Sequence, residues 1–547
     1  MPLAYIALVC WTIALTVGIY NRAILSSDAN IGILVNSDDL LPAQMAWDLH
    51  HNWHAWTNFQ WPRVPSLVPD MVWFWSAQGA GMSWRQAYLG YTWVIVATFS
   101  GAIGIAAHSL QAKSRRSLAA SLFLASLVPF AIVTATYFGQ AAFGILRWKD
   151  LLSVLIPATH GDGMVFALLA TATAARAVNG GRIARRLALA SCAIGMVCDA
   201  LFLFEFLIPF ILVERWAHVK QAATAISLPE PEPGASSPWS QRGRQVLHVV
   251  LQRSTLIREL VLASAGGWLL TDLLYRQPVA IVDSRNPFTT LPLIAPDFIH
   301  SPWTTATVIA TAVLLAYVWL TFGHDRPGIV APALVPWPPT SRRLILGTAA
   351  GAALISLMLM IPLYVETYNW RYAMAAQIWP ATVLVAVAAT NTRHGLRVAL
   401  GCLMLISAQS AFSGPLQRAP ALLQWHSNVE MCLIAAGKQH HLGAGMATYW
   451  NARQTEASSD WHQQSVLIDD LGRRRMWGND MWYFDHDMTR IDAPTRFNFI
   501  VVDKAVRVPE IVKRYGSPVW IFECHDKAVP DRMLWIYDHN LILANTP

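Results

Sequence analysis

Apolar segments of about 20 residues recur along the first three quarters of the chain, and they constrain its fold more than any other feature. A segment of about this length crosses the hydrocarbon core of a bilayer as a single helix. The segments comprise residues 3–20, 87–107, 118–138, 162–178, 187–213, 256–275, 303–322, 344–363, 372–390 and 396–412. They predict an α-helical polytopic membrane protein.

The composition agrees with a membrane location. Only 13% of the residues are charged, whereas about a quarter are charged in an average soluble domain. The 25 tryptophans suit the two interfaces of a bilayer. The formal net charge is +7, but the basic residues stand in short runs between apolar segments, as they do in cytoplasmic loops beside anionic lipid. No nucleic-acid partner is therefore expected.

The basic loops predict which side of the membrane each connection faces. Runs such as residues 182–186 are expected in the cytoplasm, so the acidic loop 21–86 lies outside and the N-terminus inside. Residues 187–213 would form a helix about 40 Å long, which is ample for one tilted span and short for two. The Pro-rich segment 214–254 that follows also looks cytoplasmic, so we expect two short helices that meet near Asp199, or a re-entrant pair. About 11 spans result, with the C-terminus outside.

From residue 413 the chain becomes polar, and short β-like runs alternate with helical patterns. The runs predict strands at residues 445–450, 465–469, 497–503, 519–524 and 533–537, with helices at residues 429–439 and 508–515. Residues 413–547 should therefore form an extracytoplasmic α/β domain after a transmembrane domain of residues 1–412. Cys432 and Cys524 lie in the polar region and could form a disulfide if it faces an oxidising compartment.

An adjacent acidic pair, Asp38 and Asp39, follows the first apolar segment. Carboxylates at the mouth of a membrane bundle cost free energy to desolvate, which favours a functional interpretation. One could accept a proton from a substrate hydroxyl, while the other binds that substrate or a cation. The same residues also suit a helix N-terminus, with Ser37 or Asp38 as its cap. Both interpretations can hold together.

Other acidic and histidine residues on the outer side could line the same cavity. Asp70 follows a proline, while His160 and Asp162 open a later apolar segment, and both aspartates are also candidate helix caps. Asp48 stands beside two histidines in a pattern that is more typical of a solvated helix face than of a metal site. The sequence thus predicts a cavity lined by Asp70, His160 and Asp162.

Arg371 is the candidate phosphate-binding residue among the outer groups. An arginine can hold a phosphate through a two-pronged contact and stays charged in a partly dry site; an arginine that snorkels among aromatic side chains is the alternative. Arg147 and Lys149 are further candidate phosphate partners. The polar and aromatic neighbours of Arg371 complete the predicted cavity: Glu366, Tyr368 and Trp370.

The order of elements in this chain resembles that of the C-type (GT-C) membrane glycosyltransferases. A first helix is followed by an outside loop with an acidic pair and then by aromatic amphipathic segments. The matching residues are Asp38 and Asp39 in NSDDLLPAQMAWDL, followed by WPRVPSLVPDM. The resemblance covers about residues 1–412 and is to a bacterial group of this superfamily. It implies a site that faces the periplasm from the bacterial inner membrane.

The resemblance also implies an activity. A sugar would move from a polyprenyl-phosphate donor to a glycan, lipid or protein acceptor, with inversion, and Asp38 or Asp39 would act as the general base. Arg371, Arg147 or Lys149 would hold the donor phosphate. No cofactor is certain, and a requirement for Mg²⁺ or Mn²⁺ stays open. The C-terminal region has no WWDYG-like signature, so N-glycosylation of protein is unsupported.

Two other classes of function compete with sugar transfer. A lipid-linked sugar flippase or another transporter would also need charges inside the membrane, although the sequence shows none of the internal repeats that many transporters carry. A non-enzymatic membrane assembly protein would use the bundle only as an anchor. That class predicts a featureless bundle, whereas this chain has acidic and basic outer loops.

Overall fold

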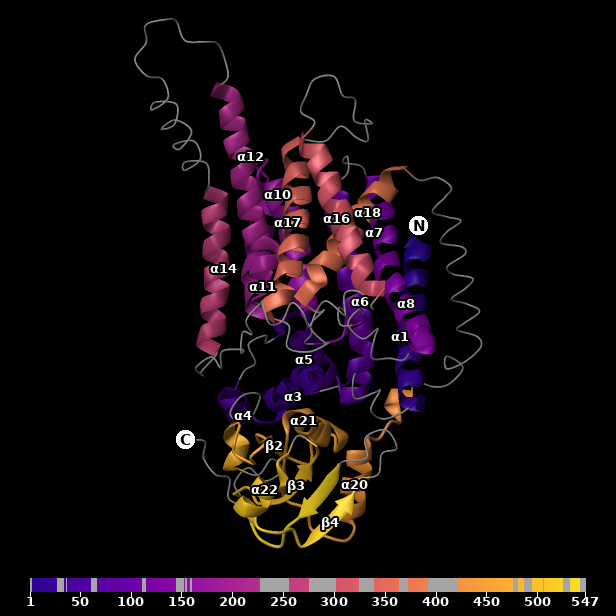
Figure 1. The fold of residues 1–547 in the computed structure, drawn as a ribbon, viewed down its shortest axis with the longest axis vertical. Helices are drawn as coiled ribbons and strands as arrows, with labels where there is room; N and C mark the ends of the chain where they lie inside the picture. Colours follow the sequence, from indigo (N-terminus) through magenta and orange to yellow (C-terminus); the bar gives the residue numbers. More distant parts are fainter. Residues whose placement is uncertain are drawn as a thin grey trace, which may run out of the picture.

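A helical bundle and a small C-terminal sheet make up the protein, with a layer of short helices between them (Figure 1). The computed structural model describes residues 2–26, 34–35, 37–60, 66–110, 115–143, 152, 155–157, 160–226, 255–274, 302–323, 339–363, 372–391, 421–475, 481–486, 494–504, 506–524 and 532–541. Most of these residues are helical, as the sequence predicts.

The described helices of the bundle run roughly side by side along the long axis of the molecule (Figure 1). They are α1 (Pro2–Ser26), α6 (Trp84–Ser109), α7 (Arg115–Ala125), α8 (Leu127–Phe143), α10 (Gly161–Ala177), α11 (Arg182–Cys198), α12 (Ile208–Ile226), α14 (Thr255–Leu274), α16 (Pro302–Gly323), α17 (Pro339–Leu363) and α18 (Met374–Asn391). Helix α10 packs against α6, α11 and α17, so it lies near the centre of the bundle.

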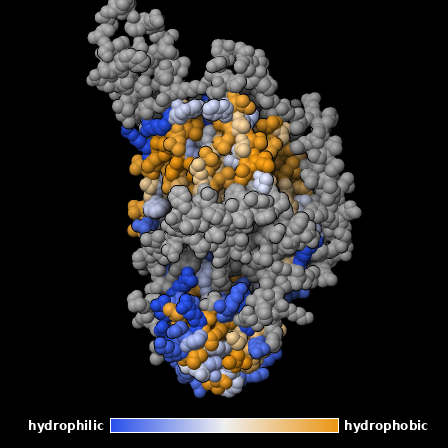
Figure 2. All heavy atoms as spheres, in the orientation of Figure 1, coloured by the Kyte–Doolittle hydropathy of each residue, from blue (hydrophilic) through white to orange (hydrophobic). Residues whose placement is uncertain are grey.

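Three of the described helical segments are long and apolar enough to cross a membrane: Trp84–Ser109, Leu118–Tyr137 and Ser341–Met360. Shorter apolar helices cover Leu8–Ile24, Thr305–Leu320 and Met374–Ala389. Hydrophobic atoms cover much of the visible, described face of the bundle (Figure 2). These features suit contact with lipid. The total of about 11 spans stays a prediction, and the predicted segment 396–412 lies outside the described residues.

The long apolar run at residues 187–213 is broken where the sequence predicts a break. Helix α11 ends at Cys198, and Asp199 has an extended backbone with φ −152° and ψ 125°. The chain re-enters helix through the turn η4 (Leu203–Leu207) and continues as α12. The predicted meeting point of two helices near Asp199 is thus confirmed. Helix α12 runs on to Ile226, past residue 214 where we expected a polar loop to begin.

The layer between the bundle and the sheet contains α3 (Ser37–His51), α4 (Trp53–Asn58), the turn η1 (Leu67–Met71) and α5 (Val72–Gly79) (Figure 1). Helix α3 packs against α5 on one side and against the C-terminal domain on the other. Asp48 on α3 is fully buried, and the Tyr483 hydroxyl of the C-terminal domain donates a hydrogen bond to it over 3.0 Å. The expected solvated face is therefore wrong for Asp48, which the domain covers, whereas His50 and His51 are exposed as expected.

The C-terminal domain is built on a five-stranded mixed sheet with the strand order β2-β1-β3-β5-β4. Its strands are β1 (Ala444–Ala447), β2 (Ser465–Leu467), β3 (Phe497–Val502), β4 (Trp520–Glu523) and β5 (Met533–Ile536). Strand β1 is parallel to β2 and β3, while β5 is antiparallel to β3 and β4. The five strands lie where the sequence predicts them, although each of them is one or two residues shorter than predicted.

Helices α20 (Asn428–Gly437), α21 (Tyr449–Ser458) and α22 (Val508–Tyr515) accompany the sheet, with the short turns η7 (Ala421–Leu423) and η8 (Met481–Phe484). The sequence predicts α20 and α22 but not α21, whose first residues were expected to continue a strand. A disulfide joins Cys432 on α20 to Cys524 at the end of β4. The pairing considered from the sequence is therefore present.

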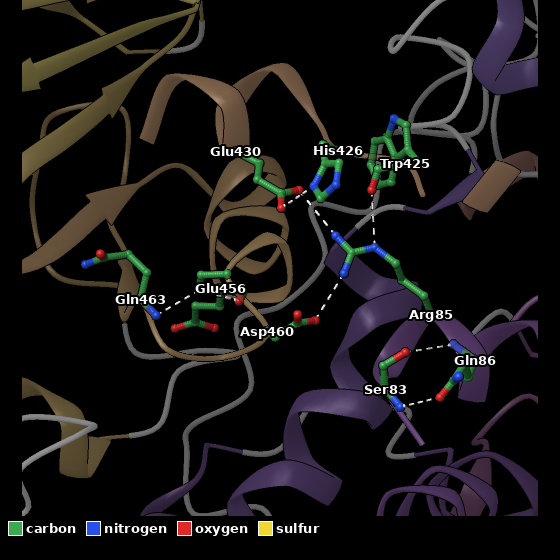
Figure 3. Close-up of polar contacts among 10 residues, drawn as sticks. Ser83, Arg85, Gln86, Trp425, His426, Glu430, Glu456, Asp460 and Gln463 are labelled. Atoms are coloured by element: carbon green, nitrogen blue, oxygen red, sulfur yellow. Dashed lines mark hydrogen bonds and ion pairs between the residues drawn. The ribbon is translucent and has the colours of Figure 1, made fainter. Parts of the chain in front are cut away.

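Arg85 in the first turn of α6 connects the bundle to this domain (Figure 3). Its guanidinium donates to the Trp425 carbonyl over 3.2 Å, lies 3.3 Å from Glu430 Oε2 and lies 3.1 Å from Asp460 Oδ1. Ser83 and Gln86 form a capping box that starts α6. The helix start thus orients Arg85 toward the domain.

Candidate functional site

The predicted acidic pair occupies the first turn of α3, and its two carboxylates face different surroundings. Asp38 is partly exposed and accepts a hydrogen bond from the Tyr449 hydroxyl of α21. Asp39 is fully buried and interacts electrostatically with Tyr20 and Tyr88. Adjacent residues on a helix point in different directions. The pair therefore offers two separate groups, as the sequence predicts.

Tyr449 belongs to the C-terminal domain, and its hydroxyl remains a donor over the physiological pH range. Burial, followed by the charge of Asp38, raises the pKa of Tyr449 well above its ordinary value. The Gln454 side chain, one turn further along α21, donates to the Val35 carbonyl over 3.0 Å. Helix α21 thus closes the domain side of the acidic pair.

A layer of buried tyrosines leads from Asp39 into the bundle. The rings of Tyr20 and Tyr88 meet edge to face with centroids 5.8 Å apart. One turn along α6, the Tyr91 hydroxyl donates to Asp70 Oδ1 over 2.5 Å. Because hydroxyl groups can both donate and accept, this layer provides polar contacts across an otherwise apolar packing.

Beyond the tyrosines, four carboxylates and an imidazole form what we term the inner acidic cluster. Its members are Asp70, His160, Asp162, Asp199 and Glu205. His160 Nδ1 lies 2.8 Å from Asp199 Oδ2. Asp162 interacts electrostatically with Asp70 and Asp199, and Glu205 interacts with Asp199 and Asp162. The turn η1, the start of α10 and the α11–α12 break supply these side chains.

All five side chains are buried: none exceeds 6% relative exposure. Asp162 Oδ2 and both carboxylate oxygens of Glu205 have no hydrogen-bond partner. A buried carboxylate without a partner is expensive, and inside a membrane protein such a group marks a functional site. Within the described ranges, no three His, Cys, Asp or Glu residues are arranged to hold a metal ion.

Local backbone features bring the members of the cluster together. Helix α10 begins after His160, and the Gly163 amide in its first turn donates to Asp162 Oδ1 over 2.8 Å. A Cβ atom on Gly163 would lie only 2.8 Å from Asp199 Oδ2. Glycine at this position therefore lets Asp199 approach α10.

The predicted site residues divide into three groups. Asp70, His160 and Asp162 meet in the inner acidic cluster, while Asp38 and Asp39 stand on the domain side of the tyrosine layer. The other predicted residues lie outside the described residues: Arg147, Lys149, Glu366, Tyr368, Trp370 and Arg371. The next residue along the chain, Tyr372, is described, and its ring centroid is 5.3 Å from that of His160.

Sequence reasoning missed three residues of this region: Asp199 as a site residue, Glu205 and Tyr449. Asp199 and Glu205 are the two acidic residues in the apolar run 187–213, and charges inside such a run are a signal for function. No sequence signal identifies Tyr449, because its contact with Asp38 joins residues 411 positions apart.

No protein-family model, curated protein or solved structure matches the chain. The geometry of the site therefore carries the functional argument.

Proposed function

We propose that the protein is a membrane glycosyltransferase that moves a sugar from a polyprenyl-phosphate donor to an acceptor on the extracytoplasmic side. The observation that carries this proposal is the inner acidic cluster, buried where the bundle meets the layer of short helices. Glycosyl transfer passes through a transition state with positive charge at the anomeric carbon, which carboxylates stabilise. Unpartnered carboxylate oxygens can also accept hydrogen bonds from sugar hydroxyls.

The reaction needs one base and one leaving group. The acceptor hydroxyl loses its proton to the base, its oxygen bonds to the anomeric carbon, and the bond from that carbon to the phosphate oxygen breaks. The electron pair leaves with the lipid phosphate, and the configuration inverts. The sequence nominates Asp38 or Asp39 as the base; of the two, the partly exposed Asp38 is the one that an acceptor could reach from water.

Lipid and glycan analysis of cells that lack the protein tests the proposal. A transferase deficiency should remove one sugar from a glycolipid or glycan and leave its polyprenyl-phosphate donor in excess. Re-expression of the wild-type chain should restore the sugar. An unchanged glycan profile, with no excess of any polyprenyl-phosphate sugar, would contradict the proposed activity.

A matched pair of variants connects this activity to the cluster. Asp162→Asn replaces a carboxyl group of the cluster with an amide of the same size, and we expect it to abolish complementation or lower the transfer rate at least about 100-fold, as losses of catalytic groups do. Asp272→Asn changes an exposed carboxylate on α14 and should complement fully. Full activity of a correctly inserted Asp162→Asn protein would exclude the cluster from the reaction.

A transporter is the second candidate, because the helix break at Asp199 adjoins buried carboxylates, an arrangement that many transporters use. The donor distribution separates the two functions. Without a transferase, the donor accumulates on the outer face of the membrane; without a flippase, it accumulates on the cytoplasmic face. A glycosidase that cannot cross sealed, right-side-out vesicles measures which face carries the donor.

A further inference from the structure

His160 and Asp199 form a buried pair whose hydrogen-bond geometry resembles that of a proton-transfer centre. His160 Nδ1 lies 2.8 Å from Asp199 Oδ2, and the relative exposures of the two residues are 6% and 1%. In the neutral tautomer that donates from Nδ1 to the Asp199 carboxylate, Nε2 keeps its lone pair. Asp199 Oδ1 accepts the Leu201 amide over 2.9 Å, so both carboxylate oxygens are fixed.

The backbone of His160 is strained in a way that aims this side chain. Its φ is 71° and its ψ is 2°, in the left-handed region that a non-glycine residue rarely adopts. A residue in this region costs on the order of 1–3 kcal/mol and persists where the surrounding structure holds it. His160 stands at the N-cap of α10 without a side-chain hydrogen bond to the helix, so capping does not account for the histidine.

Two further features of the chain bring Asp199 to His160. The α11–α12 break gives Asp199 its extended backbone, and Gly163 leaves the space that Asp199 occupies, since a Cβ there would lie 2.9 Å from Asp199 Cβ. The left-handed backbone of His160, the extended backbone of Asp199 and the missing Cβ of Gly163 thus all favour the same hydrogen bond. A pair that only filled space would not need any of them.

The surroundings of His160 Nε2 suit a substrate that donates hydrogen bonds. Within the described residues, the contact with Asp199 is the hydrogen bond that the His160 ring makes, and the unpartnered oxygens of Asp162 and Glu205 belong to the same cluster. Among the described residues, the titratable groups close by also include Asp70, Tyr91, Cys198 and the phenol of Tyr372. A hydroxyl group entering here would find acceptors in more than one direction.

We propose that His160 and Asp199 are a catalytic dyad, in which His160 Nε2 takes the proton from the acceptor hydroxyl. The inference rests on the proposed glycosyl transfer and names the proton acceptor within it. As the acceptor oxygen bonds to the anomeric carbon, its proton moves to Nε2, and the electron pair of the broken bond leaves with the lipid phosphate. Asp199 holds Nδ1–H in place and stabilises the imidazolium.

This assignment differs from a base in the predicted acidic pair on α3. Asp38 is engaged by the Tyr449 hydroxyl, and Asp39 is enclosed beside Tyr20 and Tyr88. The dyad instead offers a bare nitrogen inside the cluster that would hold the sugar. The two assignments make opposite predictions for variants of the two sites.

Steady-state kinetics of the full-length protein in detergent provide the first test. The donor probes are radiolabelled undecaprenyl-phosphate hexoses and pentoses, and the acceptor is the lipid and glycan extract of cells that lack the protein. We expect His160→Gln and Asp199→Asn to lower kcat at least about 100-fold while the KM for the donor stays unchanged. His50→Gln, which alters an exposed histidine on α3, should behave like wild type.

Nitrogen NMR of labelled histidine provides a second test that needs no activity. The His160 signals, assigned by their loss in His160→Gln, should show a protonated Nδ1 and a bare Nε2. Asp199→Asn keeps the size of the side chain but removes the charge, so the tautomer preference should weaken or reverse.

The two measurements separate the possible failures. If wild type transfers sugar and both dyad variants retain their kcat, the dyad is only structural and the proposed function stands. If wild type transfers no sugar from any probe while the tautomer is as expected, the proposed function and the catalytic role are both wrong. A kcat lost in Asp38→Asn but retained in Asp199→Asn would return the base to α3.

Discussion

At the scale of single residues, the inner acidic cluster depends on small steric and electrostatic choices. Gly163 is an example: it sits in the first turn of α10, where its missing Cβ leaves room for the Asp199 carboxylate. Asp162 and Glu205 have the opposite effect on stability: their buried, unpartnered oxygens destabilise the folded protein, and a functional role explains why they are there. Protein stability and site geometry are therefore linked here.

Two glycine-to-alanine variants test whether the close approach of Asp199 to α10 affects stability. We expect Gly163→Ala to lower the free energy of unfolding by about 1–3 kcal/mol, because the new Cβ forces Asp199 away from α10. The control is Gly101→Ala on α6, where a Cβ would meet nothing within 4 Å and the better helix former should be neutral or stabilising. Thermal unfolding in detergent measures both; equal stability of the two variants would contradict the steric argument.

Tyr515 makes the stability of the C-terminal domain depend on pH. Its hydroxyl donates to the Gly472 carbonyl over 2.5 Å, and burial raises its pKa from 10.0 to about 12. Between these values the folded chain keeps a proton that the unfolded chain releases, so the stabilisation is complete below pH 10 and is lost as the pH rises toward 12.

Tyr515→Phe should remove this pH dependence. At pH 8 the variant should be less stable by about 1 kcal/mol, since it lacks one hydrogen bond. The deficit should shrink above pH 10, because phenylalanine has no proton to lose. Tryptophan fluorescence melting between pH 8 and pH 12 follows the two proteins, and a deficit that stays constant over that range would refute the expected linkage.

At the scale of elements, most helices and strands follow from local patterns, whereas α21 does not. Its sequence YWNARQTEAS is polar, yet Asn451, Arg453 and Glu456 are buried. Arg453 pairs with Glu456 within the helix, and the Ser465 amide donates to Glu456 over 3.1 Å. The Ser465 amide reaches Glu456 only when α21 packs against β2, and α21 also packs against α3, so its helical form is a tertiary result.

The disulfide joins two elements that the chain separates widely. Cys432 on α20 and Cys524 after β4 are 92 residues apart, so reduction frees a long loop in the unfolded chain. In the chain-entropy account this lowers the stability of the domain by about 4.6 kcal/mol.

A double variant, Cys432→Ala with Cys524→Ala, should therefore melt well below wild type, and a reducing agent should lower the melting temperature of wild type but not of the variant. Cys10→Ser, at an exposed free cysteine on α1, serves as the control and should melt like wild type. A wild-type melting temperature that is insensitive to reduction would show that the bridge contributes little.

At the scale of the whole molecule, the C-terminal domain is joined to the bundle by specific polar contacts. Arg85 reaches two carboxylates and a carbonyl of the domain, and Tyr449 and Tyr483 reach aspartates on α3. Each contact pairs a group of the first 100 residues with one beyond residue 420. The domain thus forms one wall of the layer in which we place the chemistry.

Arg85→Gln tests this attachment. Glu430 is buried against Arg85, so loss of the guanidinium should cost about 3 kcal/mol of docking free energy, and α20 and α3 should exchange backbone hydrogen faster. Hydrogen exchange read by mass spectrometry reports both segments in the intact protein. The control is Arg185→Gln, which alters the exposed pair of Arg185 with Glu259 and should leave the exchange of α20 and α3 unchanged. Wild-type protection of α20 in the Arg85→Gln protein would contradict the proposed role of Arg85.

The sequence alone determined the features that depend on neighbouring residues. Long apolar runs specify helices, short β-like runs specify the five strands, and the length of residues 187–213 together with the basic segments on either side specifies the break near Asp199. The helix start at Ser37 follows from the polar residues that begin α3. These properties are local because hydropathy and backbone preference act over a few residues.

Only the tertiary structure decided which polar groups meet. The burial of Asp48, the contact of Tyr449 with Asp38 and the gathering of Glu205 with Asp162 each join segments far apart in the chain. No local pattern specifies such pairs, because they depend on how whole helices pack and on where a glycine such as Gly163 permits close approach. The apolar segments thus predict a helical bundle, while the packing of those segments determines where its charged groups converge.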